Sequence, residues 1–368
     1  MRKKQYTLLI IFIAAWVPIR AAALQTLAVG TWDIRKSNDD FPIAPSIDCK
    51  GERQNLEYRA CIASRAIIFD CRSRVLGGQK ANSCNIAGNV YYDGLTVPVN
   101  YKFAAFYYRL GCINDVRESC EKMGMMHQVG QGVPIDKRLS ATYFGIACNQ
   151  GSATSCQPAA ATFRAACNEG AGWGCTGLAK IHPKEAPGQS FDSRKLFDYQ
   201  NKGCDYGDAV GCLDLAYNNY RGNNMARNIP KAVELYIKSC NLGLPDACFA
   251  LATLYQNGRD VGKDEKRAAT LLRGACDGGD MRACASLGEM YRRGDGVDLD
   301  INKAVVLFRK ACEEKDAGAC SSLAYRYLKG EGVQADYEKA VSLFRLACRQ
   351  GNILACQELR DMGVSLEP

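Results

Sequence analysis

Cysteine pairs with seven residues between their members recur along this chain, and their recurrence limits the possible folds more than any other feature. The pairs of the regular series are Cys204/Cys212, Cys240/Cys248, Cys276/Cys284, Cys312/Cys320 and Cys348/Cys356, and Cys112/Cys120 and Cys148/Cys156 keep the same 36-residue step earlier in the chain. Self-similarity at a fixed period of this length is typical of stacked units that bury their apolar faces only against neighbours. The sequence therefore predicts a solenoid and not a single globular core.

Each 36-residue unit reads as two helices joined by a turn that contains glycine. In the unit that starts at Cys284, Leu287, Gly288 and Tyr291 follow the cysteine by three, four and seven positions, which places all four residues on one helical face. Gly294 then ends the first helix, and Asp300 precedes the second, as suits a helix N-terminus. The predicted fold class is all-α, an α-solenoid of helical hairpins.

The cysteine pairs are predicted to be disulfide staples between consecutive units. One cysteine ends the second helix of a unit and its partner opens the next helix, so a short turn brings the two within disulfide range. Each bond would contribute roughly 2–3 kcal/mol by the loop-entropy model, and no catalytic role is assigned to any of them. The predicted bonds are Cys112–Cys120, Cys148–Cys156, Cys167–Cys175, Cys204–Cys212, Cys240–Cys248, Cys276–Cys284, Cys312–Cys320 and Cys348–Cys356. Four earlier cysteines permit three connectivities, of which Cys49–Cys61 with Cys71–Cys84 is our guess.

The N-terminal region is predicted to direct export. Residues 1–23 combine a basic start, a short apolar run and a small-residue cleavage site, which is typical of a secretory signal; a retained N-terminal anchor is the alternative. Residues 24–48 read as an extended or disordered linker, residues 49–83 as an atypical capping hairpin, and residues 84–368 as the solenoid. The expected location is the periplasm or the extracellular space, with no transmembrane span after cleavage.

Composition excludes several classes of function. The chain has 20 cysteines but only two histidines, and no Cys-x₂-Cys, so we expect disulfides in an oxidising compartment and neither a metal site nor a cofactor. Loss of residues 1–23 removes four basic residues and no acid, which lowers the formal charge from +8 to +4. This ordinary charge, without long basic runs, gives no reason to expect nucleic-acid binding.

One unit departs from the pattern. Only ten residues separate Cys156 from Cys167, where its neighbours have a complete hairpin, so residues 156–175 read as one helix followed directly by another staple. A deletion inside one unit is the simpler explanation, and it would disturb the superhelix locally. A functional kink is the alternative.

The repeat resembles the Sel-one-like repeat, which belongs to the tetratricopeptide-like α-solenoids. The resemblance rests on the pattern L-[GA]-x-x-Y-x-x-G, then G-V, then K-A-x-x-L-[FY]-x-x-A, and it covers about residues 84–360. The Cys-x₇-Cys staples narrow it to the Helicobacter cysteine-rich protein type. The resemblance implies an exported right-handed superhelix with a concave face, and roles in protein–protein contacts, in binding penicillin or peptidoglycan-like ligands, or in weak β-lactamase activity.

The leading hypothesis is an exported, monomeric scaffold that binds a protein, peptide or cell-wall ligand on its concave face. If the first helices line that face, the positions five and eight residues after each opening cysteine vary enough to serve recognition. The positions six and nine residues after it are the rival, but apolar residues such as Met126, Leu254 and Met290 suggest burial there. The candidate ligand residues are Tyr92, Gln128, Tyr217, Tyr220, Gln256, Glu289, Arg292 and Tyr325.

The alternative function is β-lactam binding or hydrolysis, which would make the chain an enzyme. Its one Ser-x-x-Lys, at Ser119 and Lys122, lacks the accompanying motifs of a serine β-lactamase, and Ser119 reads as a helix N-cap. His127 occupies a position that is tyrosine in sibling repeats and reads as a packed residue. We therefore predict no catalytic residues. A third possibility is a role in assembling an envelope complex without any small ligand.

Overall fold

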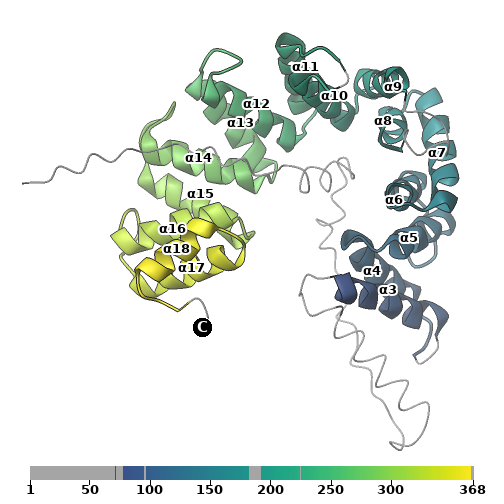
Figure 1. Ribbon diagram of the computed structural model, residues 1–368, viewed down its shortest axis with the longest axis horizontal. Coiled ribbons are helices and arrows are strands. Elements are labelled where there is room, and N and C mark those ends of the chain that lie inside the picture. Colours follow the sequence, from purple (N-terminus) through teal and green to yellow (C-terminus); the bar gives the residue numbers. More distant parts are fainter. Residues whose placement is uncertain (1–70, 72–77, 95–96, 182–191, 224, 366–368) are drawn as a thin grey trace, which may run out of the picture.

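The computed structural model describes residues 71, 78–94, 97–181, 192–223 and 225–365, and within these ranges every regular element is a helix. The helices follow one another around an open arc from α3 to α18 (Figure 1). Their bounds are α3 Gly78–Asp93, α4 Tyr101–Ile113, α5 Arg117–Val129, α6 Lys137–Asn149, α7 Ala153–Asn168, α8 Gly172–Ile181, α9 Ser193–Asp205, α10 Ala209–Arg221, α11 Ile229–Asn241, α12 Pro245–Asn257, α13 Glu265–Asp277, α14 Met281–Arg293, α15 Ile301–Glu313, α16 Ala317–Lys329, α17 Tyr337–Arg349 and α18 Ile353–Asp361.

Disulfides join each hairpin to the next. Nine bonds lie in the described residues: Cys71–Cys84, Cys112–Cys120, Cys148–Cys156, Cys167–Cys175, Cys204–Cys212, Cys240–Cys248, Cys276–Cys284, Cys312–Cys320 and Cys348–Cys356. The predicted all-α solenoid stapled by disulfides is thus confirmed. The signal segment, the linker and Cys49–Cys61 lie outside the described residues. The first described helix, α3, begins at Gly78, so the predicted boundary between capping hairpin and solenoid falls inside it.

Capping residues fix where the helices begin and end. Asp264, Asp300 and Asp336 are N-caps of second helices, and each carboxylate accepts a hydrogen bond from a backbone N–H in the first turn. The backbone N–H of the same residue donates to the carbonyl of the tyrosine that stands seven positions after the opening cysteine, as Asp300 does to Tyr291. These two bonds set the path of the turn between the helices of one hairpin.

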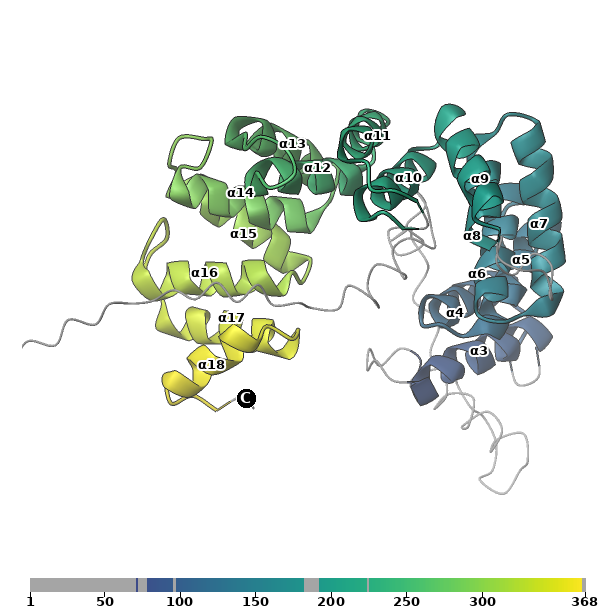
Figure 2. The same cartoon turned by 45° about the horizontal axis from the view of Figure 1, so that its top comes forward.

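The irregular unit changes how the helices alternate. Helix α7 carries two staple cysteines, Cys156 near its start and Cys167 near its end. In a regular unit, the two corresponding cysteines lie on two separate helices. One helix therefore replaces two, and the helices on either side, α6 and α8, contact each other, as do α8 and α10. Figures 1 and 2 show α7 on the outer side of the arc, with α6 and α8 on the inner side. In the units before α7, the first helix of each hairpin thus lies in the outer layer with α7. After α7 the order changes, because α8 and α10, which are also first helices of their units, lie in the same layer as α6, which is a second helix.

The core is divided at the same place. One cluster of buried side chains runs from Cys204 to Leu359 and another from Ala87 to Ala147. Between them, a smaller cluster with Phe163 and Leu178 belongs to α6, α7 and α8. The irregular unit is therefore a distinct packing unit inside the solenoid.

Candidate binding site

Several of the residues predicted from repeat position hold neighbouring repeats together. The Tyr92 hydroxyl donates to the Gln131 side chain at 2.9 Å, and the Tyr220 hydroxyl donates to Asp260 at 2.9 Å. Tyr325 donates in the same way to Glu358. Each of these bonds links one unit to the next, so these tyrosines contribute to the stacking of the solenoid.

The remaining predicted residues are also distributed over separate places. Glu289 accepts hydrogen bonds from Arg292 at 2.7 Å and from Ser322 of the next unit at 3.1 Å. Tyr217 lies under the guanidinium of Arg221, and Gln128 is exposed on α5. Because Tyr92 and Gln128 precede α7 and the others follow it, the structure does not place all eight on one layer. Their role in ligand binding stays a prediction.

The serine and histidine that an enzyme would use have structural partners. Ser119 is not the N-cap of α5, as its sequence context suggested; Val116 is, and Ser119 lies two residues into the helix, fully buried. Its hydroxyl donates to the Asn85 side chain at 3.0 Å, while the ammonium of Lys122 lies over the Tyr92 ring. A buried hydroxyl with this partner is not positioned as a nucleophile.

His127 is packed inside the fold. It stacks on Tyr143, its Nδ1 lies 3.1 Å from the Pro134 carbonyl oxygen, and burial lowers its pKa below the ordinary value. His182 lies outside the described residues. Within the described ranges, no three His, Cys, Asp or Glu side chains gather as a metal ion would require.

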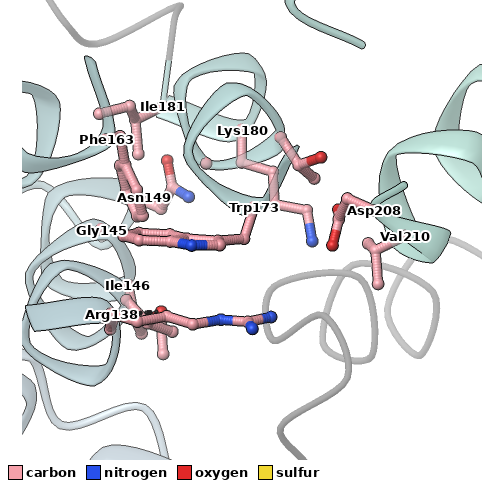
Figure 3. Close-up of a pocket in the computed structure, with 13 residues that line it drawn as sticks. Arg138, Gly145, Ile146, Asn149, Phe163, Trp173, Lys180, Ile181, Asp208 and Val210 are labelled. Carbon is pink, nitrogen blue, oxygen red and sulfur yellow. Dashed lines mark hydrogen bonds between the residues drawn. The ribbon is translucent and has the colours of Figure 1, made fainter. Parts of the chain in front are cut away.

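A pocket opens instead on the inner side of the arc, at the irregular unit. It lies between α6, α7 and α8 and reaches the turn before α10, and it encloses about 490 Å³, including space open to solvent. Figure 3 shows its side chains converging from these separate elements. The lining residues are Arg138, Thr142, Gly145, Ile146, Asn149, Phe163, Trp173, Thr176, Gly177, Lys180, Ile181, Asp208 and Val210.

An aromatic ring with a cation against it forms the centre of the pocket. The Trp173 ring packs edge-to-face on Phe163, with centroids 6.1 Å apart, and the Arg138 guanidinium lies 5.7 Å from the Trp173 centroid. Both Trp173 and Arg138 are partly exposed. A flat aromatic ring that is held on one side and partly open is a favourable contact for a ligand.

A second cation, Lys180 on α8, also lines the pocket. The Lys180 side chain points toward Asp208 (Figure 3), and Asp208 is the N-cap of α10, accepting the Gly211 N–H at 3.0 Å. On α10, burial raises the pKa of the Asp214 carboxyl to about 6; the nearby Lys180 opposes this shift and the Asp208 charge adds to it. The pocket therefore carries two cations and one acid on its lining.

Small residues make this junction possible. A Cβ atom on Gly177 would lie 2.4 Å from the Phe163 ring, and one on Gly203 would lie 2.4 Å from the Thr176 hydroxyl. The Thr176 hydroxyl is buried and has no hydrogen-bond partner among the described residues. The close approach of α8 to α7 and α9 thus depends on glycine.

Sequence reasoning did not find this site. Lys180 stands five residues after Cys175, at one of the recurring positions considered, but it was not among the candidates, and Arg138 and Trp173 stand at positions that the prediction did not use. The signal that could have found them was the shortened unit itself, together with Trp173, a large aromatic residue between the two cysteines of the Cys167–Cys175 staple. Both were visible in the sequence, but neither indicates which distant residues would join them.

Comparison with known families identifies the repeat. The Sel1 repeat model matches residues 81–115, 117–152, 209–244, 245–280, 282–316 and 317–352, so its matches stop before α7 and resume at α10. Seven of the thirteen residues that line the pocket thus lie in the segment between the matched repeats. No curated protein matches the chain.

Solved structures show the same fold. The chain is similar to a protective antigen of uropathogenic Escherichia coli with an SLR fold (24% identity, 83% of this chain, 69% of that chain, TM-score 0.51) and to a Sel1 repeat protein from Oxalobacter formigenes (19%, 88%, 97%, 0.50). It is also similar in sequence to Helicobacter pylori cysteine rich protein B, with 31% identity over 36% of this chain and 96% of that chain, at a TM-score of 0.31. At these identities, the first two likenesses establish the fold alone.

Proposed function

Because this chain belongs to the Sel1 repeat family, and is of its disulfide-stapled Helicobacter cysteine-rich type, we propose that it is an exported scaffold that binds a partner protein at the inner pocket. Sel1 repeat proteins are in general scaffolds for protein–protein interaction. The observation that carries the proposal is the pocket between α6, α8 and the start of α10. It offers a concave surface with an aromatic centre, which is what a protruding partner side chain requires.

Two further observations support export and a protein ligand. The nine disulfides leave no free cysteine among the described residues, which fits an oxidising compartment. A partner protein would contact several units at once, and the pocket already draws its lining from four helices and a turn.

Site-specific photo-crosslinking tests this proposal. The full chain would carry p-benzoylphenylalanine at position 149, where Asn149 lies on the exposed rim of the pocket, or at position 266 as a control, where Lys266 is exposed on α13. In an extract of the cells that make the protein, we expect a discrete protein adduct from position 149 that unlabelled chain competes away. Equal adducts at both positions, or none at position 149, would refute binding at the pocket.

A further inference from the structure

We infer that the chain has a second binding site, at Tyr327, which takes a phosphate group between Arg309 and Lys339. These side chains come from three consecutive helices, α15, α16 and α17, near the C-terminal end of the arc and away from the pocket at α6 to α8 (Figure 1). The inference does not depend on the proposed function, because it concerns other residues and a different ligand.

Two cations lie against the side chain of Tyr327. The Arg309 guanidinium donates a hydrogen bond to its hydroxyl oxygen at 3.5 Å, and the Lys339 ammonium lies 4.5 Å from the centroid of its ring. Tyr327 itself is buried, whereas Arg309 and Lys339 are both exposed. Two positive charges from different helices are therefore brought together at the surface, beside a ring that packing holds in place.

This group offers several hydrogen-bond donors but no negative charge. Neither Arg309 nor Lys339 forms an ion pair with an acid among the described residues, and the proton of the Tyr327 hydroxyl has no acceptor there. Asp336 is held as the N-cap of α17, where it accepts the backbone N–H of Lys339 at 2.9 Å. Because like charges close together repel, an anion bound between the two cations would stabilise the arrangement.

The electrostatics of the hydroxyl agree with this geometry. The pKa of Tyr327 is lowered below its usual value, first by Lys339, with burial acting against this shift and Arg309 adding to it. The charges that act on the hydroxyl are thus positive. A hydroxyl in such surroundings is a favourable donor to an anion.

The preceding unit has the same arrangement but supplies its own acid. Tyr291 accepts a hydrogen bond from Arg273 at 3.0 Å, and the Lys303 ammonium lies 5.4 Å from the centroid of its ring. Asp300, however, forms an ion pair with Lys303 at 3.1 Å. Of these two equivalent positions, the one at Tyr327 is therefore the one that leaves both cations available to a ligand.

The directions of the donors favour a phosphate group over a carboxylate. A phosphate group has three acceptor oxygens and a charge of about −1.5 to −2 at pH 7. The guanidinium of Arg309, the ammonium of Lys339 and the hydroxyl of Tyr327 can each bind a different oxygen. A carboxylate has two oxygens and one charge, so it would satisfy this set only in part. The phosphate group could belong to the free ion or to a monoester.

The test observes Tyr327 directly. The full chain is labelled with carbon-13 at Cζ of its tyrosines, and a Tyr327→Phe variant assigns the resonance of that residue. The labelled chain is then titrated at constant ionic strength with sodium phosphate, with phenyl phosphate and with sodium acetate. The first two probes distinguish the free ion from a monoester, and the third tests the preference over a carboxylate.

We expect a saturable shift of the Tyr327 resonance with phosphate, with phenyl phosphate or with both, and binding at least about tenfold weaker with acetate, since a charge-assisted contact is lost. A shift with only one of the two phosphate probes supports the site and identifies the source of the group. Arg309→Gln and Lys339→Gln should each weaken binding about tenfold. Lys303→Gln makes the same change at the equivalent position one unit earlier and should not alter the affinity, and thermal unfolding verifies that the variants fold.

Three results would overturn the inference: no shift with either phosphate probe, equal affinity for acetate, or equal losses in Lys339→Gln and Lys303→Gln. The proposed function is tested separately by crosslinking at position 149. Failure of either experiment therefore rejects one site and leaves the other standing.

Discussion

At the scale of single residues, the junction of α8 and α10 contains a carboxyl group that is costly to ionise. Burial is the main cause that raises the pKa of Asp214 from 3.8 to about 6, with Lys180 acting against it and Asp208 with it. The folded state therefore binds this proton more tightly than the unfolded state does. The resulting stabilisation is complete below about pH 4 and is lost as the pH rises through about 6.

Replacing this acid should reverse that loss. We expect Asp214→Asn to raise the free energy of unfolding at pH 8 by about 1–2 kcal/mol, a value reduced because the side chain is partly exposed, and to have little effect at pH 4. Urea unfolding at the two pH values measures the difference. Asp277→Asn, at an exposed position on α13, serves as the control and should give the same small effect at both. An equal change for Asp214→Asn at both pH values would contradict the assignment.

Thr176 provides a second test at this scale. Its hydroxyl is buried without a partner among the described residues, whereas the Thr253 hydroxyl donates to the Phe249 carbonyl at 2.9 Å. Because an unpartnered buried polar group is destabilising, Thr176→Val should raise the free energy of unfolding by about 1 kcal/mol, while Thr253→Val should lower it or leave it unchanged. Denaturant midpoints of the two variants decide the matter. A loss in Thr176→Val would mean that the hydroxyl has a partner in solution.

At the scale of elements, small residues determine how closely α8 packs. A Cβ on Gly174 would lie 2.6 Å from the Phe163 carbonyl oxygen, and one on Gly177 would lie 2.4 Å from the Phe163 ring. Contacts this short cannot persist, so α8 would have to move away from α7. Since Trp173 and Lys180 are both on α8, such a movement would also change the pocket.

Gly177→Ala should therefore destabilise the chain by about 1–3 kcal/mol, as overpacking does. In the chain labelled with 5-fluorotryptophan, it should also shift the fluorine resonance of Trp173. Gly274→Ala is the matched control, because Gly274 is exposed in helix α13 and an added Cβ there would meet nothing within 4 Å. The control should stabilise by up to about 1 kcal/mol through helix propensity. Equal effects of the two substitutions on unfolding would show that α8 is not closely packed.

At the scale of the whole molecule, stability is assembled along a line. Each hairpin contacts its neighbours in sequence, and the helices on either side of α7 join the two larger clusters of buried side chains through a smaller one. In such a molecule, a local defect affects the adjoining units most and distant units least. The position of a staple should therefore decide how far the effect of its loss extends.

Removal of the last staple should affect only the end of the solenoid. We expect Cys348→Ala with Cys356→Ala to lower local stability by about 2–3 kcal/mol and to speed hydrogen exchange in α17 and α18 alone. Cys276→Ala with Cys284→Ala should instead speed exchange on both sides of the lost bond, in α12 to α15. Hydrogen exchange followed by mass spectrometry compares the two. A uniform increase along the chain for either variant would indicate one cooperative core in place of a linear array.

Local patterns in the sequence were sufficient for the repeating part of the molecule. The period, the helix positions, the N-caps such as Asp300 and the cysteine pairs depend on interactions within about one unit, so spacing along the chain determines them. For the same reason, Ser119 was misplaced as a cap, since its partner, Asn85, lies one unit away. Several predicted ligand residues likewise find their partners in the next repeat, where alignment of the repeats alone does not reveal them.

Only the tertiary structure decided where the pocket forms. The sequence indicated an irregular unit. It did not indicate that α7 would replace two helices and thereby bring α8 into contact with both α6 and α10 along one layer. That packing joins Arg138, Trp173 and Lys180 across separate elements, with Val210 at the far end. No local rule specifies such a meeting, because it depends on how whole helices fit against one another in space.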